Sequence, residues 1–353
     1  MLEQREVAYK SGIQLFCIDT IKLLTPMKKE EKYRWLTEVS NTSLQKECRI
    51  LDFSFQSFFK KQNRYPKYKS RKRSKKSYPV CDDPRCFYFE DSSVQIQKVG
   101  KVKYKSDFSI PKGKMNKFIN VSISYLDGKW FLSFSLERES QAPVLTETYM
   151  GIDLGTRKLA TVVFGEKVFC FGNINDSLVM KKLDKRERML AKQLSHKYRI
   201  NKRLTGKYIE SNSAKKIKKK LRKARKKKHD IRNNYVHHIT STLVKMLPRC
   251  VVMEDLDIEG MLKNKYRAKA IHEACWYEFI RQLRYKCERK GIEFIQVDRY
   301  FPSSKTCSKC GNINTVFGSD EVYVCPECGF TIDRDINAAR NLIIHAGGNC
   351  DVQ

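Results

Sequence analysis

Three acidic residues stand at the ends of segments whose patterns indicate two strands and a helix. Asp153 ends the apolar stretch MGID, Glu254 ends VVME, and Asp335 opens the helical stretch INAARNLII. Neighbouring strands would place Asp153 and Glu254 at one edge of a sheet, and a helix crossing that edge would add Asp335. Carboxylate oxygens suit Mg²⁺, and two such ions about 4 Å apart can activate a water for phosphodiester hydrolysis. The three residues are therefore candidate catalytic ligands of two Mg²⁺ ions.

Neighbouring acidic residues have simpler interpretations. Asp333 is expected to cap the helix that follows it, and Asp255 and Asp257 are expected to face solvent. Asp153 alone, in the sequence DLG, would be weak, because the phosphate-binding loops of actin-like ATPases carry the same short sequence. The combination of the three carboxylates is what favours hydrolysis of phosphodiesters.

Four of the 13 cysteines form two C-x-x-C-G pairs separated by about fourteen residues. Two thiolates three residues apart can turn toward one ion, and the following glycine lets the chain bend beneath the sulfur atoms. Two such pairs complete a tetrahedron, which predicts one structural zinc ion held by Cys307, Cys310, Cys325 and Cys328. Cys81 and Cys86 have no partner pair and are interpreted as turn residues.

The chain carries 71 Lys and Arg against 39 Asp and Glu, a net charge of +32. Such an excess indicates a polyanion-binding protein, most simply one that binds nucleic acid. Two segments concentrate the charge. The first is Lys215–Lys228, which predicts a projecting basic helix or a tail that orders on binding; a solvated charged face is the alternative. The second is residues 64–78, which predict a basic arm that binds phosphate; a disordered linker is the alternative. The candidate contacts in these segments are Lys67, Tyr68, Lys69, Arg71, Lys218, Lys219, Lys220 and Arg222.

Hydrophobic periodicity indicates the elements that position these residues. Apolar stripes from Ile13 to Leu24 and from Leu44 to Phe59 predict helices, with a break at Pro26. Alternating apolar and polar residues from Val94 to Glu139 predict a small antiparallel β-barrel.

Beyond a linker at residues 140–147, apolar strands alternate with helices, which predicts an α/β part. We place the boundaries at residues 1–78 (helices and basic segment), 79–146 (barrel), 147–302 and 330–353 (α/β part), and 303–329 (zinc-binding lobe). No apolar run approaches the roughly 20 residues that span a bilayer, and the start of the chain lacks a signal-peptide pattern. Unpaired cysteines in apolar surroundings favour a reducing cytosol, so we expect a cytoplasmic protein without membrane partners.

Four motifs in this order resemble those of the TnpB family of RNA-guided nucleases, which is related to type V CRISPR effectors. The motifs are GIDLGTRKLATVV, HHITSTLVKMLPRCVVMEDL, VDRYFPSSKTCSKCG and CPECGFTIDRDINAARNL, and they cover roughly residues 148–346. The resemblance implies a wedge barrel with a helical recognition insert, followed by an RNase H-like (RuvC) domain with an inserted zinc ribbon. Family members usually begin with a strand, whereas here the helical pattern begins almost at Met1, so we expect the barrel to lack its first strand.

The resemblance also implies a function. We expect an RNA-guided, metal-dependent DNA endonuclease of an insertion sequence, with a guide RNA from the element's right end and a double-stranded DNA target. Asp153, Glu254 and Asp335 match the family's catalytic positions. The alternatives are an RNA-guided repressor that binds without useful cleavage, which the three carboxylates disfavour, and an accessory transposase or recombination protein. Single-strand transposases use a tyrosine with paired histidines, and His237-His238 lacks a suitable tyrosine nearby. The sequence does not indicate the oligomeric state.

Overall fold

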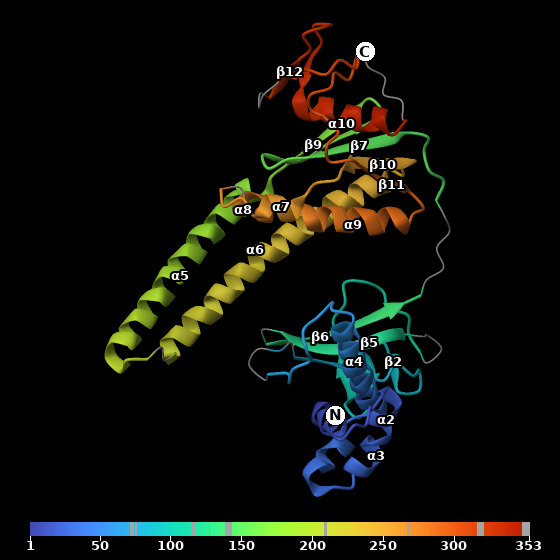
Figure 1. Cartoon of the computed structure of the whole chain (residues 1–353), viewed down its shortest axis with the longest axis vertical. Helices are drawn as coiled ribbons and strands as arrows, with labels where there is room; N and C mark the ends of the chain where they lie inside the picture. The colour runs from blue at the N-terminus through green and yellow to red at the C-terminus, as the bar shows by residue number, and fades with distance from the viewer. Residues whose placement is uncertain are drawn as a thin grey trace. The chain divides into compact units, whose positions relative to one another are not determined.

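The chain divides into two compact units, Met1–Ser140 and Gln141–Gln353 (Figure 1). The computed structural model describes residues 1–70, 74, 76–113, 118–126, 128–137, 143–207, 210–266, 268–315 and 321–347. Among these residues, no helix is both long and apolar enough to cross a membrane.

The N-terminal unit begins with helices: α1 (Leu2–Lys10), α2 (Cys17–Lys22), α3 (Leu24–Met27), the 3-10 helix η1 (Glu31–Glu38) and α4 (Asn41–Phe59). The stripe from Leu44 to Phe59 is confirmed as α4, but a helix from Ile13 is wrong, because Ile13 is exposed and α2 begins only at Cys17. The Asp19 carboxylate accepts a hydrogen bond from the Phe16 N–H at 2.9 Å and so fixes this later start. Pro26 lies inside α3 rather than ending a helix; in a first turn its missing N–H costs little.

The described residues of this unit also form two antiparallel sheets, of strand order β1-β5-β6 and β2-β3-β4. Their bounds are β1 (Lys76–Pro79), β2 (Phe87–Phe89), β3 (Ser93–Ile96), β4 (Gly100–Lys103), β5 (Phe118–Leu126) and β6 (Lys129–Leu136). One core of aromatic and branched side chains joins both sheets, with Phe87, Phe89 and Phe118 almost fully buried. The expectation of a closed barrel is not met, because among the described strands β2 and β4 pair with no strand of the other sheet. Pro79, which has no N–H to donate, ends β1.

The C-terminal unit is built on a five-stranded sheet of order β11-β10-β7-β8-β9. The hairpin strands β7 (Tyr149–Leu154), β8 (Lys158–Phe164) and β9 (Lys167–Gly172) are antiparallel, whereas β10 (Cys250–Glu254) runs parallel to β7 and β11 (Glu293–Val297) runs parallel to β10. The middle strands are apolar over nearly their whole length, as expected for strands covered on both faces. The predicted α/β part is confirmed.

Helices cover the two faces of this sheet (Figure 1). On one face, the core contains side chains from α6 (Asn212–Lys245), α8 (Ala268–Ala274) and α9 (Trp276–Glu288). On the other face, α10 (Arg334–His345) packs across β7, β8 and β10. The remaining elements are η2 (Ile174–Asp176), α5 (Leu178–Thr205), α7 (Ile258–Leu262), β12 (Val322–Val324) and β13 (Thr331–Asp333).

Candidate active site

Strand periodicity directs Asp153 and Glu254 to the face of the sheet that α10 covers. Met150 and Ile152 on β7 are fully buried in the core on the α6 and α9 side. Because side chains alternate along a strand, Asp153 projects to the opposite face. Met253 on β10 is also in the α6–α9 core and is paired in register with Ile152, so Glu254 projects to the same face as Asp153 at the same end of the parallel strands.

Helix α10 lies directly on β7 at Gly151. A Cβ atom at this position would come within 2.1 Å of the Ala339 carbonyl oxygen and 2.8 Å of Ile343 Cγ1. Only glycine therefore allows the helix to approach the strand this closely. The contact fixes the height of α10 above the sheet, and its first turn carries Asp335 toward the edge where Asp153 lies.

Asp333 and Asp335 have different surroundings, although only one residue separates them. Asp333 is the N-cap of α10: its Oδ1 accepts hydrogen bonds from the backbone N–H groups of Asp335 (2.9 Å) and Ile336 (3.2 Å), which confirms the expected cap. Its Oδ2 accepts a hydrogen bond from Lys158 Nζ at 2.8 Å. Asp335 is held less closely, at 3.6 Å from Lys158 Nζ and 3.3 Å from the Arg334 guanidinium.

The charges of the two other candidate carboxylates act on Asp153. Burial is the largest cause, and together with the charges of Asp335 and Glu254 it raises the pKa of Asp153 to about 7. Burial also raises the pKa of Glu254. Burial would raise the pKa of Asp333 too, but the hydrogen bonds from Lys158 and from the Ile336 N–H outweigh it and leave that pKa lowered. A bound cation would stabilise the ionised form of a buried carboxyl group such as Asp153, whose ionisation neighbouring negative charges oppose.

The carboxylates are close enough to repel one another but do not converge on a point. Within the described ranges, one group of three or more metal-ligating side chains has all its ligand atoms within 4.8 Å of one another, and that group consists of cysteines. Asp335 instead forms ion pairs with Lys158 and Arg334. These cations, Lys158 on β8 and Arg334 on α10, offset part of the acidic charge.

The four cysteines of the C-x-x-C-G pairs meet as their spacing predicts. The sulfur atoms of Cys307 and Cys328 lie 3.7 Å apart, and those of Cys310 and Cys325 lie 3.6 Å apart. A tetrahedron with Zn–S bonds of roughly 2.3 Å has edges of about 3.8 Å, so the donor set fits zinc. Both knuckle glycines have left-handed backbone, with φ of +77° at Gly311 and +69° at Gly329. Cys81 and Cys86 belong to no such group in the part of the chain that the structure describes.

Two asparagines of α10 attach this cysteine lobe to the sheet, and sequence analysis did not identify them. Asn337 accepts a hydrogen bond from the Ser308 N–H (3.0 Å) and donates one to the Thr306 carbonyl (2.6 Å). Asn341 donates to the carbonyls of Ser303 (2.7 Å) and Thr306 (2.6 Å). Both side chains are buried. The sequence did contain a signal for them, because both are polar residues within an apolar helical stripe. A buried amide requires hydrogen-bond partners, so such residues indicate a polar contact with another segment.

The basic segment Lys215–Lys228 is one half of a helical hairpin. The segment is helical, as one of the two predictions had it. Leu221 and Ala224 of α6 are buried against Leu190 of α5, so its few apolar residues form a small core that the prediction did not include. The charge pattern concealed this, because α5 supplies the partner carboxylates: Glu187 accepts hydrogen bonds from Arg225 (2.8 Å) and Lys228 (3.0 Å).

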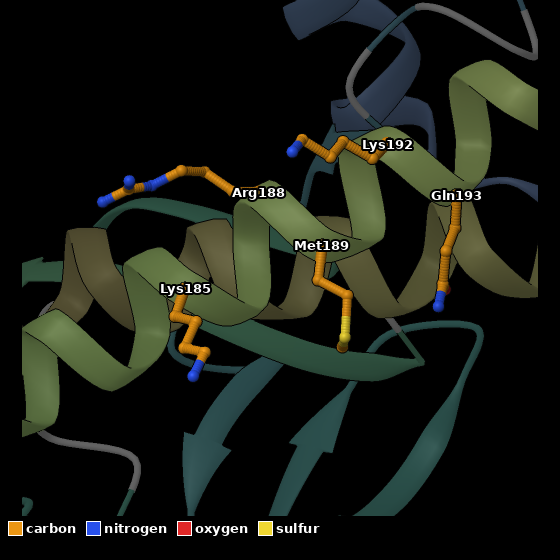
Figure 2. A pocket seen from close by; sticks show the side chains of 5 residues that line it. All are labelled: Lys185, Arg188, Met189, Lys192 and Gln193. Atoms are coloured by element: carbon orange, nitrogen blue, oxygen red, sulfur yellow. The ribbon is translucent and has the colours of Figure 1, made fainter.

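The candidate contacts on α6 differ in their availability. Lys218 Nζ lies 3.0 Å from Glu210. Lys219, Lys220 and Arg222, called the α6 trio below, are exposed and have no ion-pair partner among the described residues. Sequence analysis missed a second cationic row on α5, where Lys185, Arg188 and Lys192 project from the helix beside Met189 and Gln193 (Figure 2).

In the basic arm of the N-terminal unit, Lys69 is paired with Glu47 of α4 at 3.0 Å, whereas Lys67 and Tyr68 are exposed. Tyr68 has 70% of its surface accessible. Arg71, the remaining candidate in this arm, lies outside the described residues.

Comparison with known proteins gives matches along most of the chain. A family model described as "Cas12f1-like, TNB domain" matches residues 276–342, and one described as "Probable transposase" matches residues 133–265. A Streptomyces pristinaespiralis protein named "Putative RNA-guided DNA endonuclease" is 31% identical over 97% of this chain and 78% of its own length. The Escherichia coli K12 protein "Putative RNA-guided DNA endonuclease InsQ" is 29% identical over 91% of this chain and 78% of its own length. The fold is similar to that of Cas12f1 in a complex with guide RNA and target DNA, with a TM-score of 0.58 and 16% identity over 86% of this chain and 70% of that one.

Proposed function

The chain belongs to the TnpB family of RNA-guided DNA endonucleases, and from this premise we propose that Asp153, Glu254 and Asp335 cut DNA that a bound RNA selects. RNA and DNA are the partners that the relatives' names imply. We further propose that the RNA is transcribed from the right end of the insertion sequence and that the DNA target is double-stranded.

One observation supports the catalytic assignment. The strand register and the packing of α10 on β7 direct three carboxylates from distant parts of the chain to one side of the sheet. Asp153, Glu254 and Asp335 would hold two Mg²⁺ ions, which supply an activated water and offset charge on the leaving oxygen. The raised pKa of Asp153 supports this, because carboxylates that repel one another require a nearby cation to stay ionised. Asp333 is already committed to the helix cap and to Lys158, so its role is to position Asp335.

The test compares substitutions of these carboxylates in protein purified with its RNA. Asp153→Ala should abolish cleavage and leave RNA and DNA binding intact, and titration calorimetry should show weaker Mn²⁺ binding. Asp255→Asn is the matched control, because Asp255 is half exposed and pairs with Arg299 on the surface, where an ion pair contributes little. Full cleavage by Asp153→Ala would refute the assignment.

Asp333 and Asp335 provide a second comparison within the same site. Asp335→Asn should abolish cleavage. Asp333→Asn keeps an oxygen that can cap the helix, so its cleavage should only fall. The reverse order would show that Asp333 is the catalytic residue.

Two proposals concern the nucleic-acid contacts. The α6 trio would bind phosphate, because its cations are exposed and unpaired on a hairpin that projects from the sheet (Figure 1). Lys67 and Tyr68, together with Lys69 and Arg71, would read a short DNA motif beside the target, as a guided nuclease needs a protein-read motif to begin opening the duplex.

The motif proposal is tested by cutting a library with randomised flanks. Lys67→Ala or Tyr68→Ala should change which flanking motif is accepted, with a base-specific loss of about 1–3 kcal/mol. Lys69→Ala should change the accepted motif less than Lys67→Ala does, because the charge of Lys69 is already partly neutralised by Glu47. A uniform loss over all flanks would show that the arm is a nonspecific basic linker.

A further inference from the structure

An exposed aromatic row crosses the sheet of β1, β5 and β6 in the N-terminal unit. Lys76 on β1 is paired in register with Tyr125 on β5, and Tyr125 with Trp130 on β6, so the three side chains form one line on one face. The Tyr125 and Trp130 rings lie 4.8 Å apart between centroids, and Lys76 Nζ lies 5.4 Å from the centre of the Tyr125 ring.

This row continues the apolar face of the sheet beyond the end of its core. Two residues along the strands, on the same face, lie the paired residues Ile123 and Leu132, which belong to or pack against the core between the two sheets. Trp130 in the aromatic row is 69% accessible, so the residues that the structure describes leave most of this side chain uncovered. The cross-strand contact accounts for the position of Tyr125, but it leaves one face of a large indole ring in water.

The chemistry of the row limits the kinds of ligand that could cover it. Flat aromatic rings stack on nucleobases of any identity, and a cation beside them attracts the phosphate backbone. A protein segment would cover apolar area equally well, but the sequence adjoining the row is strongly basic. RKRSKK directly precedes or begins β1 in the sequence, Lys129 precedes Trp130, and the chain has a net charge of +32. Charge complementarity therefore favours a polyanion that offers flat bases.

We propose that Trp130, supported by Tyr125 and Lys76, stacks an unpaired nucleobase. The site lies in a different unit from the candidate active site. The inference rests on the proposed nucleic-acid partnership but on no step of cleavage. The base could belong to the bound RNA or to a DNA strand displaced from the duplex, and stacking on Trp130 is the same chemistry in either case.

The test measures binding of short single strands to the full chain, followed by anisotropy of a labelled oligonucleotide. Trp130→Ser should weaken binding by about 5- to 150-fold, the range that loss of one base–aromatic stack produces. Because phosphate contacts remain, the slope of log K against log salt should not change. Trp130→Phe should recover part of the affinity. Trp35→Ser is the matched control, because Trp35 is 58% exposed on η1 and lies outside the row.

Three comparisons make the result decisive. An abasic strand with the same number of phosphates should bind the wild type no better than the intact strand binds Trp130→Ser. Stronger binding of RNA than of DNA of equal sequence identifies the guide as the source of the base, and the opposite order identifies the displaced strand. Thermal unfolding of Trp130→Ser and Trp130→Leu shows whether each variant is folded. Equal affinities of folded Trp130→Ser and wild type, or of abasic and intact strands for the wild type, would overturn the proposal. The outcome is independent of cleavage, so failure of the proposed nuclease activity would be seen separately.

Discussion

Substituting Gly151 by alanine tests whether the contact between α10 and β7 sets the geometry of the candidate active site. The new Cβ would lie 2.1 Å from the Ala339 carbonyl oxygen, whereas an ordinary contact begins at 3.4 Å, so helix and strand must separate by about 1.3 Å. Rotation of the Ile343 side chain relieves only its own contact at 2.8 Å. The Ala339 oxygen belongs to the helix backbone and can move only with the helix.

Two consequences of this displacement can be given a size. Overpacking of a well-packed core costs typically about 1–3 kcal/mol, so the free energy of unfolding should fall by that amount. A displacement of about 1 Å in catalytic geometry can lower a rate by about 100-fold, and α10 carries Asp335. The cleavage rate should therefore fall by about one to two orders of magnitude because Asp335 is misplaced. The protein itself should still be mostly folded.

The assay is single-turnover cleavage well below the unfolding temperature, together with urea unfolding of the same samples. Gly172→Ala is the matched control, because Gly172 ends β9 in the same sheet and an added Cβ there meets no atom within 4 Å. That variant should cut at the wild-type rate and have nearly unchanged stability. Wild-type cleavage and stability in Gly151→Ala would refute the argument that this contact positions the helix.

Three further predictions concern the zinc lobe, the hairpin and a buried lysine. The purified chain should contain one zinc ion, lost together with solubility in Cys328→Ser; elemental analysis that finds no zinc in fresh wild-type protein would contradict this. Replacing the α6 trio with glutamine should flatten the dependence of log K on log salt by about 0.7 per lost contact to single strands and about 0.9 per contact to duplex DNA, whereas exchanging lysine and arginine within the trio should preserve it; an unchanged slope on neutralisation would show a merely solvated face. Burial lowers the pKa of Lys286 to about 8, although Glu278 opposes the shift. The unfolded chain then binds more protons above that pH, so wild-type stability should rise relative to Lys286→Met as pH increases from about 8 to 10, by no more than about 3 kcal/mol. Parallel urea-stability profiles of the two proteins would refute the shift.

The sequence alone was sufficient where the determining interactions are local. The C-x-x-C-G pairs fix their own turns, because the glycine after each second cysteine adopts the left-handed backbone that lets the knuckle close. The apolar strands that carry Asp153 and Glu254 near their ends were predictable for a related reason, since a strand covered on both faces requires a continuous apolar run. The assignment of the three carboxylates as catalytic stays a prediction.

Local patterns were insufficient where a capping contact or a distant partner decided the outcome. The stripe from Ile13 to Leu24 has helical spacing, yet the Asp19 cap delays the helix to Cys17. The basic half of α6 lacks a visible apolar face, yet α5 supplies both an apolar seam and carboxylates for it. The two sheets of the N-terminal unit share a core, but their described strands do not close into a barrel, and alternation along single strands cannot reveal this.

The different surroundings of Asp333 and Asp335 were decided by tertiary structure. Both residues begin the same helix, and their spacing allows either to cap it or to face a metal. Lys158, which is 175 residues from Asp333 in the chain, pairs with its carboxylate. Gly151, which is about as far from Asp333 in the chain, allows α10 to pack closely on β7. Such contacts depend on how separate elements pack together, and the periodicity of one segment carries no information about the surface that another segment brings to it.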